Sequence, residues 1–239
     1  GCRSPRSWIG WASMAEKVFL KDGTKGWVLP LLPTDREALV REFESLSPES
    51  RRRRFLMPVV HLSDAMLKHL VDEVDGVDHV ALVLMAKAGD EVVPTGIARC
   101  VRYPHEPEAA DIAVTVKDDW QGRGVATALL EVLMRRRPEG VTHLLTEVAA
   151  DNPASLAMLR HLGPVRTFDT GMGILDVEVD LVPTGHSLVQ EEPHERLHEV
   201  LADPGRARLR ARDLVCPWLR PSGEEAAELP DELPGAQPS

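Results

Sequence analysis

A glycine-rich turn between a predicted strand and a predicted helix constrains this chain more than any other feature. Apolar residues predict a strand over 109–116, a polar turn follows over 117–120, and Pro138 ends the helix that comes next. The first turn of a helix has four unpaired N–H groups and a partial positive charge, and glycines let an anion approach without Cβ clashes. We therefore expect a pyrophosphate site in the turn that reads Gln121-Gly122-Arg123-Gly124-Val125-Ala126-Thr127.

Two common phosphate-binding motifs do not match this turn. The Gly-Lys-Ser/Thr ending of a P-loop is missing, and no predicted parallel βαβ unit with a ribose-binding acid surrounds it. A glycine-rich turn ahead of an amphipathic helix, without any ligand, is the remaining alternative.

The rest of the chain alternates between strand and helix patterns. Asp22-Gly23 favours a tight turn inside an opening hairpin over 18–32. Helical spacing then predicts one helix from Thr34 or Asp35, a second after Pro48, and a third that Ser63 caps. The later predictions are strands over 79–86, 92–101 and 109–116 forming an antiparallel meander, a helix over 121–137, a strand over 141–148, a helix over 152–162 and two strands within 165–182.

Composition suggests one folded domain with an extension at each end. Residues 1–16 are expected to be a disordered N-terminal extension. They contain no apolar stretch of the length a signal peptide needs, so export is not indicated. Residues 17–182 carry the regular patterns and form the predicted domain. Residues 183–239 are acidic and rich in proline towards their end, so a partly helical or disordered tail is expected.

A second motif follows the glycine-rich turn at about thirty residues. The stretch Asn152-Pro153-Ala154-Ser155-Leu156-Ala157-Met158 opens a predicted helix, and Leu162-Gly163 ends it. Together with Gln121-x-x-Gly124-x-Ala126, it resembles the paired signatures of the GNAT superfamily of N-acetyltransferases. The resemblance covers about residues 17–182. It implies an α/β GNAT (acyl-CoA N-acyltransferase) fold with a mixed, mostly antiparallel central sheet and helices on both faces, and acetyl-CoA as cosubstrate.

The same resemblance assigns cofactor contacts. Residues 121–127 would hold the CoA pyrophosphate, and the backbone of Val114 and Val116 would pair with the pantetheine arm. A backbone N–H near Val114 would polarise the acetyl carbonyl. Asn152 and Ser155 would also contact the cofactor, although Asn152 followed by Pro153 is equally the pattern of a helix N-cap.

Acetyl transfer to an amine requires a base, because an alkylamine is almost fully protonated at neutral pH. The segment Ala110-Asp111-Ile112-Ala113 resembles an Ala-Glu-hydrophobe-Ala strand of the bacterial protein-lysine acetyltransferases, in which the acidic residue is the general base. The resemblance therefore implies that Asp111 is the base, through a bridging water because Asp is shorter than Glu. A solvent-facing strand residue or ion-pair partner is the alternative, and Glu106, Glu108 and Glu147 are reserve candidates.

Other segments narrow the resemblance to that lysine-acetyltransferase branch. Residues 46–55 resemble its Leu-Ser-x-x-Ser-Arg-x-x-Arg-Phe stretch, and Asp22-Gly23-Thr24 resembles its opening hairpin. The four arginines at 51–54 would engage the CoA 3'-phosphate or an acidic protein, or form a solvated helix face. Many relatives place a tyrosine acid where this chain has Leu159, so solvent is expected to protonate the leaving thiolate. Tyr103 is expected to pack in a turn.

Charge and cysteine usage exclude several classes. The net charge of -10 argues against general nucleic-acid binding, and no apolar run reaches the ~20 residues of a membrane span. The three cysteines lack metal-ligand spacing, and His194 and His198 lack a third ligand, so no metal is expected and a cytoplasmic location fits.

We predict an enzyme that transfers acetyl from acetyl-CoA to a primary amine by direct attack in a ternary complex. A protein lysine is the acceptor that the resemblance implies. The alternatives are a catalytically weak acyl-CoA-binding regulatory protein and an antibiotic or polyamine acetyltransferase. The oligomeric state is left open between monomer and homodimer.

Overall fold

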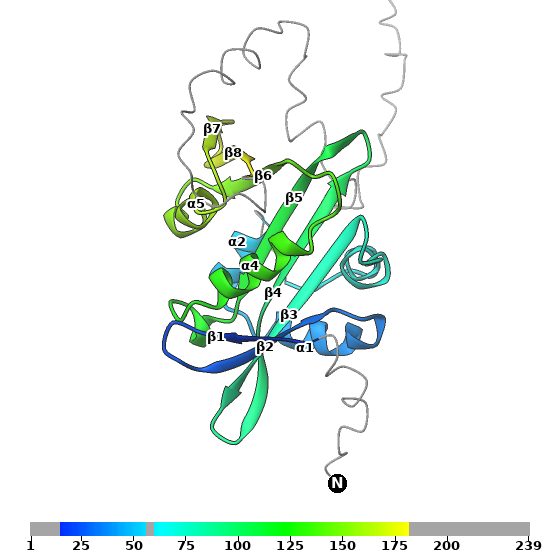
Figure 1. Ribbon diagram of the computed structural model, residues 1–239, viewed down its shortest axis with the longest axis vertical. Helices are drawn as coiled ribbons and strands as arrows, with labels where there is room; N and C mark the ends of the chain where they lie inside the picture. Colours follow the sequence, from blue (N-terminus) through cyan, green and yellow to red (C-terminus); the bar gives the residue numbers. More distant parts are fainter. Residues whose placement is uncertain (1–14, 56–59, 182–239) are drawn as a thin grey trace, which may run out of the picture.

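The computed structural model describes residues 15–55 and 60–181, which form an α/β fold around one mixed sheet (Figure 1). The sheet has eight strands in the order β1-β2-β3-β4-β5-β6-β8-β7. All neighbouring strands are antiparallel except β5 and β6. The strands are β1 (Glu16–Phe19), β2 (Lys25–Pro30), β3 (His79–Ala88), β4 (Glu91–Tyr103), β5 (Glu106–Val116), β6 (His143–Ala149), β7 (Val165–Asp169) and β8 (Ile174–Asp180).

Helices cover both faces of this sheet, and the period-two alternation of β4 shows how. Ala98 and Cys100 point into a core that contains Leu129 and Leu133 of helix α4, whereas Ile97 packs against the core on the opposite face. The predicted fold class is thereby confirmed. The helices are η2 (Pro33–Asp35), α1 (Arg36–Glu44), α2 (Pro48–Phe55), α3 (Asp64–Leu67), which continues as the π-type turn η3 (Lys68–Asp72), η4 (Asp118–Trp120), α4 (Val125–Arg135) and α5 (Pro153–Arg160).

The predicted opening hairpin and the capped third helix are both confirmed. Gly23 adopts φ +82° in the turn between β1 and β2, a conformation that glycine accepts without strain. Ser63 caps α3 by accepting the Met66 N–H at 3.2 Å. The segment ends where one oxygen of Asp75 accepts three backbone N–H groups, those of residues 77 to 79.

Two predicted boundaries differ from the structure. The helix expected from Gln121 begins at Val125, because Gly122 and Gly124 adopt φ +74° and +88°, which a right-handed helix does not contain. Strand β1 begins at Glu16, one residue before the predicted start of the domain. The rest of the predicted N-terminal extension, apart from residue 15, and the predicted acidic tail lie outside the described residues. In the described ranges no helix has the length and apolar character to cross a membrane.

Candidate active site

A wedge opens in the sheet where β5 and β6 part. These two parallel strands pair at Ala109 with His143 and at Ala110 with Leu144. Strand β6 pairs with β8 over its whole length, from His143 to Ala149. Strand β5 continues beyond Ala110 to Val116, where it pairs with β4. Within the described residues, the β6-facing side of β5 therefore has no strand partner over residues 111–116.

The register with β4 decides which backbone groups of β5 point into this wedge. Lys117 donates its N–H to Thr95 at 2.9 Å, while Val116 lies opposite Gly96. In an antiparallel ladder this makes Val116 a non-hydrogen-bonded pair, whose N–H and C=O point away from β4. Alternation gives Val114 the same orientation. The two valines predicted to bind pantetheine thus direct their peptide groups into the wedge.

Two side chains donate hydrogen bonds to backbone carbonyls of β5 that face the wedge. Thr146 of β6 donates its hydroxyl to the Ile112 carbonyl at 3.1 Å, and Gln121 donates its side-chain amide to the Val116 carbonyl at 3.4 Å. Both contacts agree with the orientation deduced from the register. The closed end of the wedge lies near Ile112, and its open end lies beside the glycine-rich turn.

The glycine-rich turn presents backbone N–H groups at the start of α4. The first hydrogen bond of the helix runs from the Ala128 N–H to the Gly124 carbonyl at 3.0 Å, so the N–H groups of residues 125–127 precede it. A Cβ built on Gly122 meets nothing within 4 Å, so space adjoins the backbone at this position. Unpaired N–H groups at the positive end of an 11-residue helix suit a diphosphate.

The side chain of Arg123 braces this turn against the opening hairpin. Its guanidinium donates to the Asp22 carboxylate at 2.6 Å and to the Thr24 hydroxyl at 3.1 Å, and it lies 4.0 Å from the centre of the Trp120 ring. Hydrogen bonds from Thr24, and then Arg123, lower the pKa of Asp22 to about 2. Lys21 also donates its N–H to the Arg123 carbonyl at 3.0 Å. Arg123 therefore offers its backbone N–H to a ligand, while its side chain holds the turn in place.

Helix α2 is fastened to the same turn. Asp118 accepts the Ser47 N–H at 3.0 Å and the hydroxyls of Ser47 and Ser50 at 2.7 and 2.8 Å. The Gln121 amide in turn donates to the Ser50 hydroxyl at 3.2 Å. The first residue of the turn is thus oriented by a helix more than 60 positions earlier in the sequence.

The other side of α2 reaches the segment after β6. Arg52 pairs with Asp151 at 2.8 Å and with Glu49 at 3.0 Å. Arg51 is not part of a solvated face, because its guanidinium donates to three backbone carbonyls, those of Glu44, Leu46 and Val60. Helix α2 therefore links both sides of the wedge, through Asp118 after β5 and Asp151 after β6.

The second predicted motif forms the start of α5. Asn152 accepts the Ser155 N–H at 3.3 Å and donates its amide to the Ser155 hydroxyl at 2.7 Å, with Pro153 in the first helical turn. This confirms the N-cap interpretation, and a cofactor contact by either residue stays a prediction. A Cβ on Gly163 would lie 1.9 Å from the Asp180 carbonyl oxygen, which explains why glycine follows Leu162.

Asp111 lies on the α1–α2 face of β5, beside the wedge. It is opposite Val101, and alternation places it on the same face as Arg99. Burial raises the pKa of this carboxyl more than the Thr146 hydrogen bond, the Arg54 charge and the Arg99 charge lower it. A raised pKa brings a carboxylate closer to the basicity that proton abstraction from an amine requires.

The reserve carboxylates differ in their position. Glu106 contacts His143 at 3.1 Å at the start of β5, and Glu108 is nearby, so both are away from the open end of the wedge. Glu147 is on β6, and continuation of the β5–β6 register would place it level with Ala113 and on the face of Asp111. Glu147 is thus the reserve candidate that faces the wedge.

Neither Leu159, which occupies the position where many relatives have a tyrosine acid, nor Tyr103 is placed to donate a proton to the leaving thiolate. Leu159 is only 2% exposed and packs into the core beneath α5. Tyr103 donates its hydroxyl to the Leu145 carbonyl at 2.9 Å and is buried, so it packs between strands rather than in a turn. Cys100 is buried, and burial raises the pKa of its thiol to about 12.

Sequence reasoning missed two residues of the site region. Asp118 holds α2 against the turn, and nothing local in the sequence indicates a partner 71 residues away. Arg99 is a buried arginine within the apolar strand β4, and a charge in the middle of a predicted core strand was the available signal. Within residues 15–55 and 60–181 no group of three or more His, Cys, Asp or Glu side chains is arranged to hold a metal ion.

Comparisons with known proteins agree with this geometry. The profile of the Acetyltransferase (GNAT) family matches residues 42–163. Acetyltransferase Pat of Mycolicibacterium smegmatis is 32% identical over 195 residues, which are 81% of this chain and 56% of that relative. Acetyltransferase PA5475 of Pseudomonas aeruginosa is 31% identical over 145 residues, which are 60% of this chain and 77% of the relative. This chain thus spans little more than half the length of the Pat relative.

A solved structure also superimposes on the described fold. The GNAT domain of S. lividans PAT is similar with a TM-score of 0.59 and 31% identity. The match covers 71% of this chain and 98% of that domain. The similarity therefore extends over nearly all of a separately crystallised GNAT domain.

Proposed function

The chain belongs to the GNAT acetyltransferase family, and from this premise we propose that it transfers an acetyl group from acetyl-CoA to a protein lysine by direct attack in a ternary complex. Enzymes of this family use acetyl-CoA. The observation that carries the proposal is the wedge between β5 and β6, which ends at the N-terminus of α4. It places peptide groups for an amide-rich arm next to N–H groups for a diphosphate.

In this proposal each part of acetyl-CoA has a matching surface. The pyrophosphate lies against the N–H groups of residues 122–127, and the pantetheine arm pairs with the peptide groups of Val114 and Val116. The acetyl group then reaches the narrow end of the wedge. There the Val114 N–H stabilises the negative charge that develops on the carbonyl oxygen.

The transfer itself needs one base and a stable leaving group. A neutral lysine amine attacks the thioester carbon, a C–N bond forms, and the C–S bond breaks as the tetrahedral intermediate collapses. Asp111 accepts the amine proton through a water, and solvent protonates the departing thiolate, whose ordinary pKa is near 8.5. The buried position of Leu159 supports a route without a side-chain acid at that position.

Direct attack is favoured over an acetyl-cysteine intermediate. Cys100 is the cysteine within the described residues, and its buried thiol, with a pKa of about 12, stays protonated at neutral pH. The thiolate is the nucleophilic form of cysteine, so this side chain is unsuited to attack a thioester.

The choice of a protein lysine rests on resemblance to the bacterial protein-lysine acetyltransferases and on the Pat relatives.

The test is acetylation of lysine proteins and peptides compared with polyamines and aminoglycosides, read by mass spectrometry and by release of CoA thiol. We expect acetyl-lysine on protein or peptide and faster thiol release with it than with any small amine. Modification of small amines alone would overturn the lysine assignment. Acetyl-CoA binding without thiol release from any acceptor would favour a regulatory acyl-CoA-binding protein instead.

A further inference from the structure

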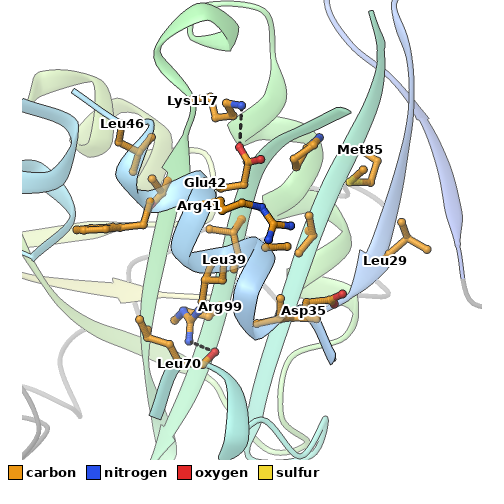
Figure 2. A pocket seen from close by; sticks show the side chains of 18 of the residues that line it. Leu29, Asp35, Leu39, Arg41, Glu42, Leu46, Leu70, Met85, Arg99 and Lys117 are labelled. Carbon is orange, nitrogen blue, oxygen red and sulfur yellow. Dashed lines mark hydrogen bonds and ion pairs between the residues drawn. The ribbon is translucent and has the colours of Figure 1, made fainter. Parts of the chain in front are cut away.

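A cavity lies beneath α1, on the sheet face opposite α4 (Figure 2). Its volume of about 520 Å³ falls within the usual range of small-molecule sites. Apolar side chains from four elements form its walls, with Leu39 on α1, Leu29 on β2, Val83 on β3 and Ile97 on β4. Asp111, Val114 and the glycine-rich turn are not among its lining residues, although Thr115 and Lys117 are, so the cavity adjoins β5 on its α1 face without including the proposed cofactor contacts.

A buried arginine stands at one end of this cavity. Arg99 is 4% exposed and lines the space, and Figure 2 shows it at the end marked by Leu70. Its Nη1 donates to the Leu70 carbonyl at 3.2 Å and contacts Nε2 of His79 at 3.2 Å. Both partners are neutral acceptors, and among the described residues Arg99 forms no ion pair. A buried guanidinium normally has a carboxylate or phosphate partner.

The surroundings of Arg99 leave its charge poorly balanced. Burial, and then the Arg54 charge, lower the pKa of Arg99 to about 9, while the Asp111 charge opposes this shift. Burial, followed by the Arg99 charge, lowers the pKa of His79 to about 3, so that imidazole is neutral at pH 7. Arg54 lines the same cavity. The buried Arg99 guanidinium therefore gives this end of the space a positive charge.

At the opposite end of the cavity, the charged side chains neutralise each other. Lys117 and Glu42 form an ion pair at 2.7 Å, which Figure 2 shows across the cavity from Arg99. Elsewhere in the lining, Asp35 accepts the Leu32 N–H at 2.9 Å as part of the turn before α1, and Arg41 lies 4.0 Å from the Glu37 carboxylate. The carboxylates of the lining thus have partners of their own, and the charge left for a ligand is positive.

We propose that this cavity binds a small amphipathic carboxylate, with its anionic head at Arg99 and its apolar chain between α1 and the sheet. A carboxylate can accept two hydrogen bonds from one guanidinium, which supplies the partner that Arg99 lacks. The chain of the ligand would replace water against the leucine, valine and isoleucine walls. The proposal goes beyond acetyl transfer and does not depend on it.

Octanoate is a suitable probe, with octan-1-ol and octylamine as controls of the same chain length. Isothermal titration calorimetry of the full chain should show one octanoate per protein. Both controls should bind at least about tenfold more weakly, because neither provides a charge-assisted acceptor for Arg99. Equal affinity for octanoate and octan-1-ol, or no octanoate binding, would overturn the proposal.

Three variants locate the site. Arg99→Gln should weaken octanoate binding at least about tenfold, while the matched control Arg160→Gln, an exposed arginine on α5, should bind as the parent does. Val83→Phe fills the cavity and should abolish octanoate binding while acetyl-CoA still binds. If Val83→Phe binds octanoate with the affinity of the parent, octanoate binds outside this cavity and the proposal is wrong. If Arg99→Gln lacks a cooperative melting transition, the Val83 variant and the head-group comparison decide the matter.

Discussion

Removing the Asp118 side chain should loosen α2 and weaken acetyl-CoA binding together. The Asp118→Ala variant loses the acceptor of three hydrogen bonds, from the Ser47 N–H, the Ser47 hydroxyl and the Ser50 hydroxyl. Ser50 also accepts the amide of Gln121, the first residue of the glycine-rich turn. The substitution therefore affects acetyl-CoA binding indirectly, because it loosens α2, and Ser50 of α2 orients the Gln121 amide.

The size of the effect follows from these contacts. An intramolecular hydrogen bond contributes a net ~0.5–1.5 kcal/mol, and water replaces part of it at an exposed group such as Asp118, so the three together should contribute about 1–2 kcal/mol. For a domain of this size such a loss lowers Tm by roughly 2–8 °C. The KM for acetyl-CoA should rise several-fold, with a smaller change in kcat, because Asp118 does not touch the reacting atoms.

The pH dependence of the stability difference identifies its cause. Burial raises the pKa of Asp118, but the hydrogen bonds from Ser47 and Ser50 outweigh it and hold the pKa below the ordinary 3.8. A lowered folded-state pKa gives stability that is present above pH 3.8 and is lost as the pH falls through the folded-state value. The difference in Tm between parent and Asp118→Ala should therefore be full at pH 7 and shrink below pH 3.8.

Thermal melts by circular dichroism and acetyl-CoA saturation kinetics provide the assay. Asp119→Ala is the matched control, since it removes a neighbouring exposed carboxylate that forms no hydrogen bond with α2 in the described part of the chain. A Tm loss of the same size in both variants would refute the reasoning. So would an Asp118→Ala protein whose KM for acetyl-CoA equals that of the parent.

Three further predictions concern other parts of the site. Asp111→Asn should retain acetyl-CoA affinity and lose turnover, most at low pH where free amine is scarce, and unchanged kcat/KM would remove Asp111 from the mechanism. Because burial raises the pKa of Asp111, its stabilising contribution is lost as the pH rises through that folded-state value, so the Asn variant should gain Tm over the parent towards neutral pH. Gly163→Ala should lower stability by roughly 1–3 kcal/mol in urea titrations, since the new Cβ would overlap the Asp180 carbonyl, and the control Gly171→Ala, whose Cβ meets nothing, should cost less. Cys100 should resist a thiol reagent at pH 8 in a chain whose other cysteines are serine and react on unfolding, whereas fast native-state labelling would contradict its burial.

The sequence was most informative where a local physical requirement dictates a residue type. Positive φ at Gly23, Gly122 and Gly124 explains why the hairpin turn and the glycine-rich turn could be located from dipeptides and spacing, while anion binding by the second turn stays a prediction. The caps at Ser63 and Asn152 are equally local, since each side chain bonds a backbone N–H three residues ahead. Alternation of apolar residues sufficed to order β3, β4 and β5 as a meander.

Long-range pairings carried no such local signal. Asp118 meets Ser47 across 71 positions, and Arg52 meets Asp151 across 99. The position of β8 between β6 and β7 was likewise not predicted. The last two strands of the sheet pair with each other whether β7 or β8 lies next to β6, so their sequence does not distinguish the two orders. Each of these features depends on which surfaces meet after the sheet has assembled, and that is decided by packing rather than by neighbouring residues.

The parting of β5 from β6 divides the sheet into two groups of strands, here called slabs. Five strands, from β1 to β5, form one slab, and β6, β8 and β7 form the other. Strand pairing between β5 and β6 is confined to Ala109–His143 and Ala110–Leu144, and side-chain contacts such as Tyr103–Leu145 and Thr146–Ile112 add to it. During slow local opening we expect the two slabs to separate first beyond Ala110, where strand pairing between them ends. Amide exchange should therefore be coupled among the three strands of the smaller slab and proceed independently of the larger one.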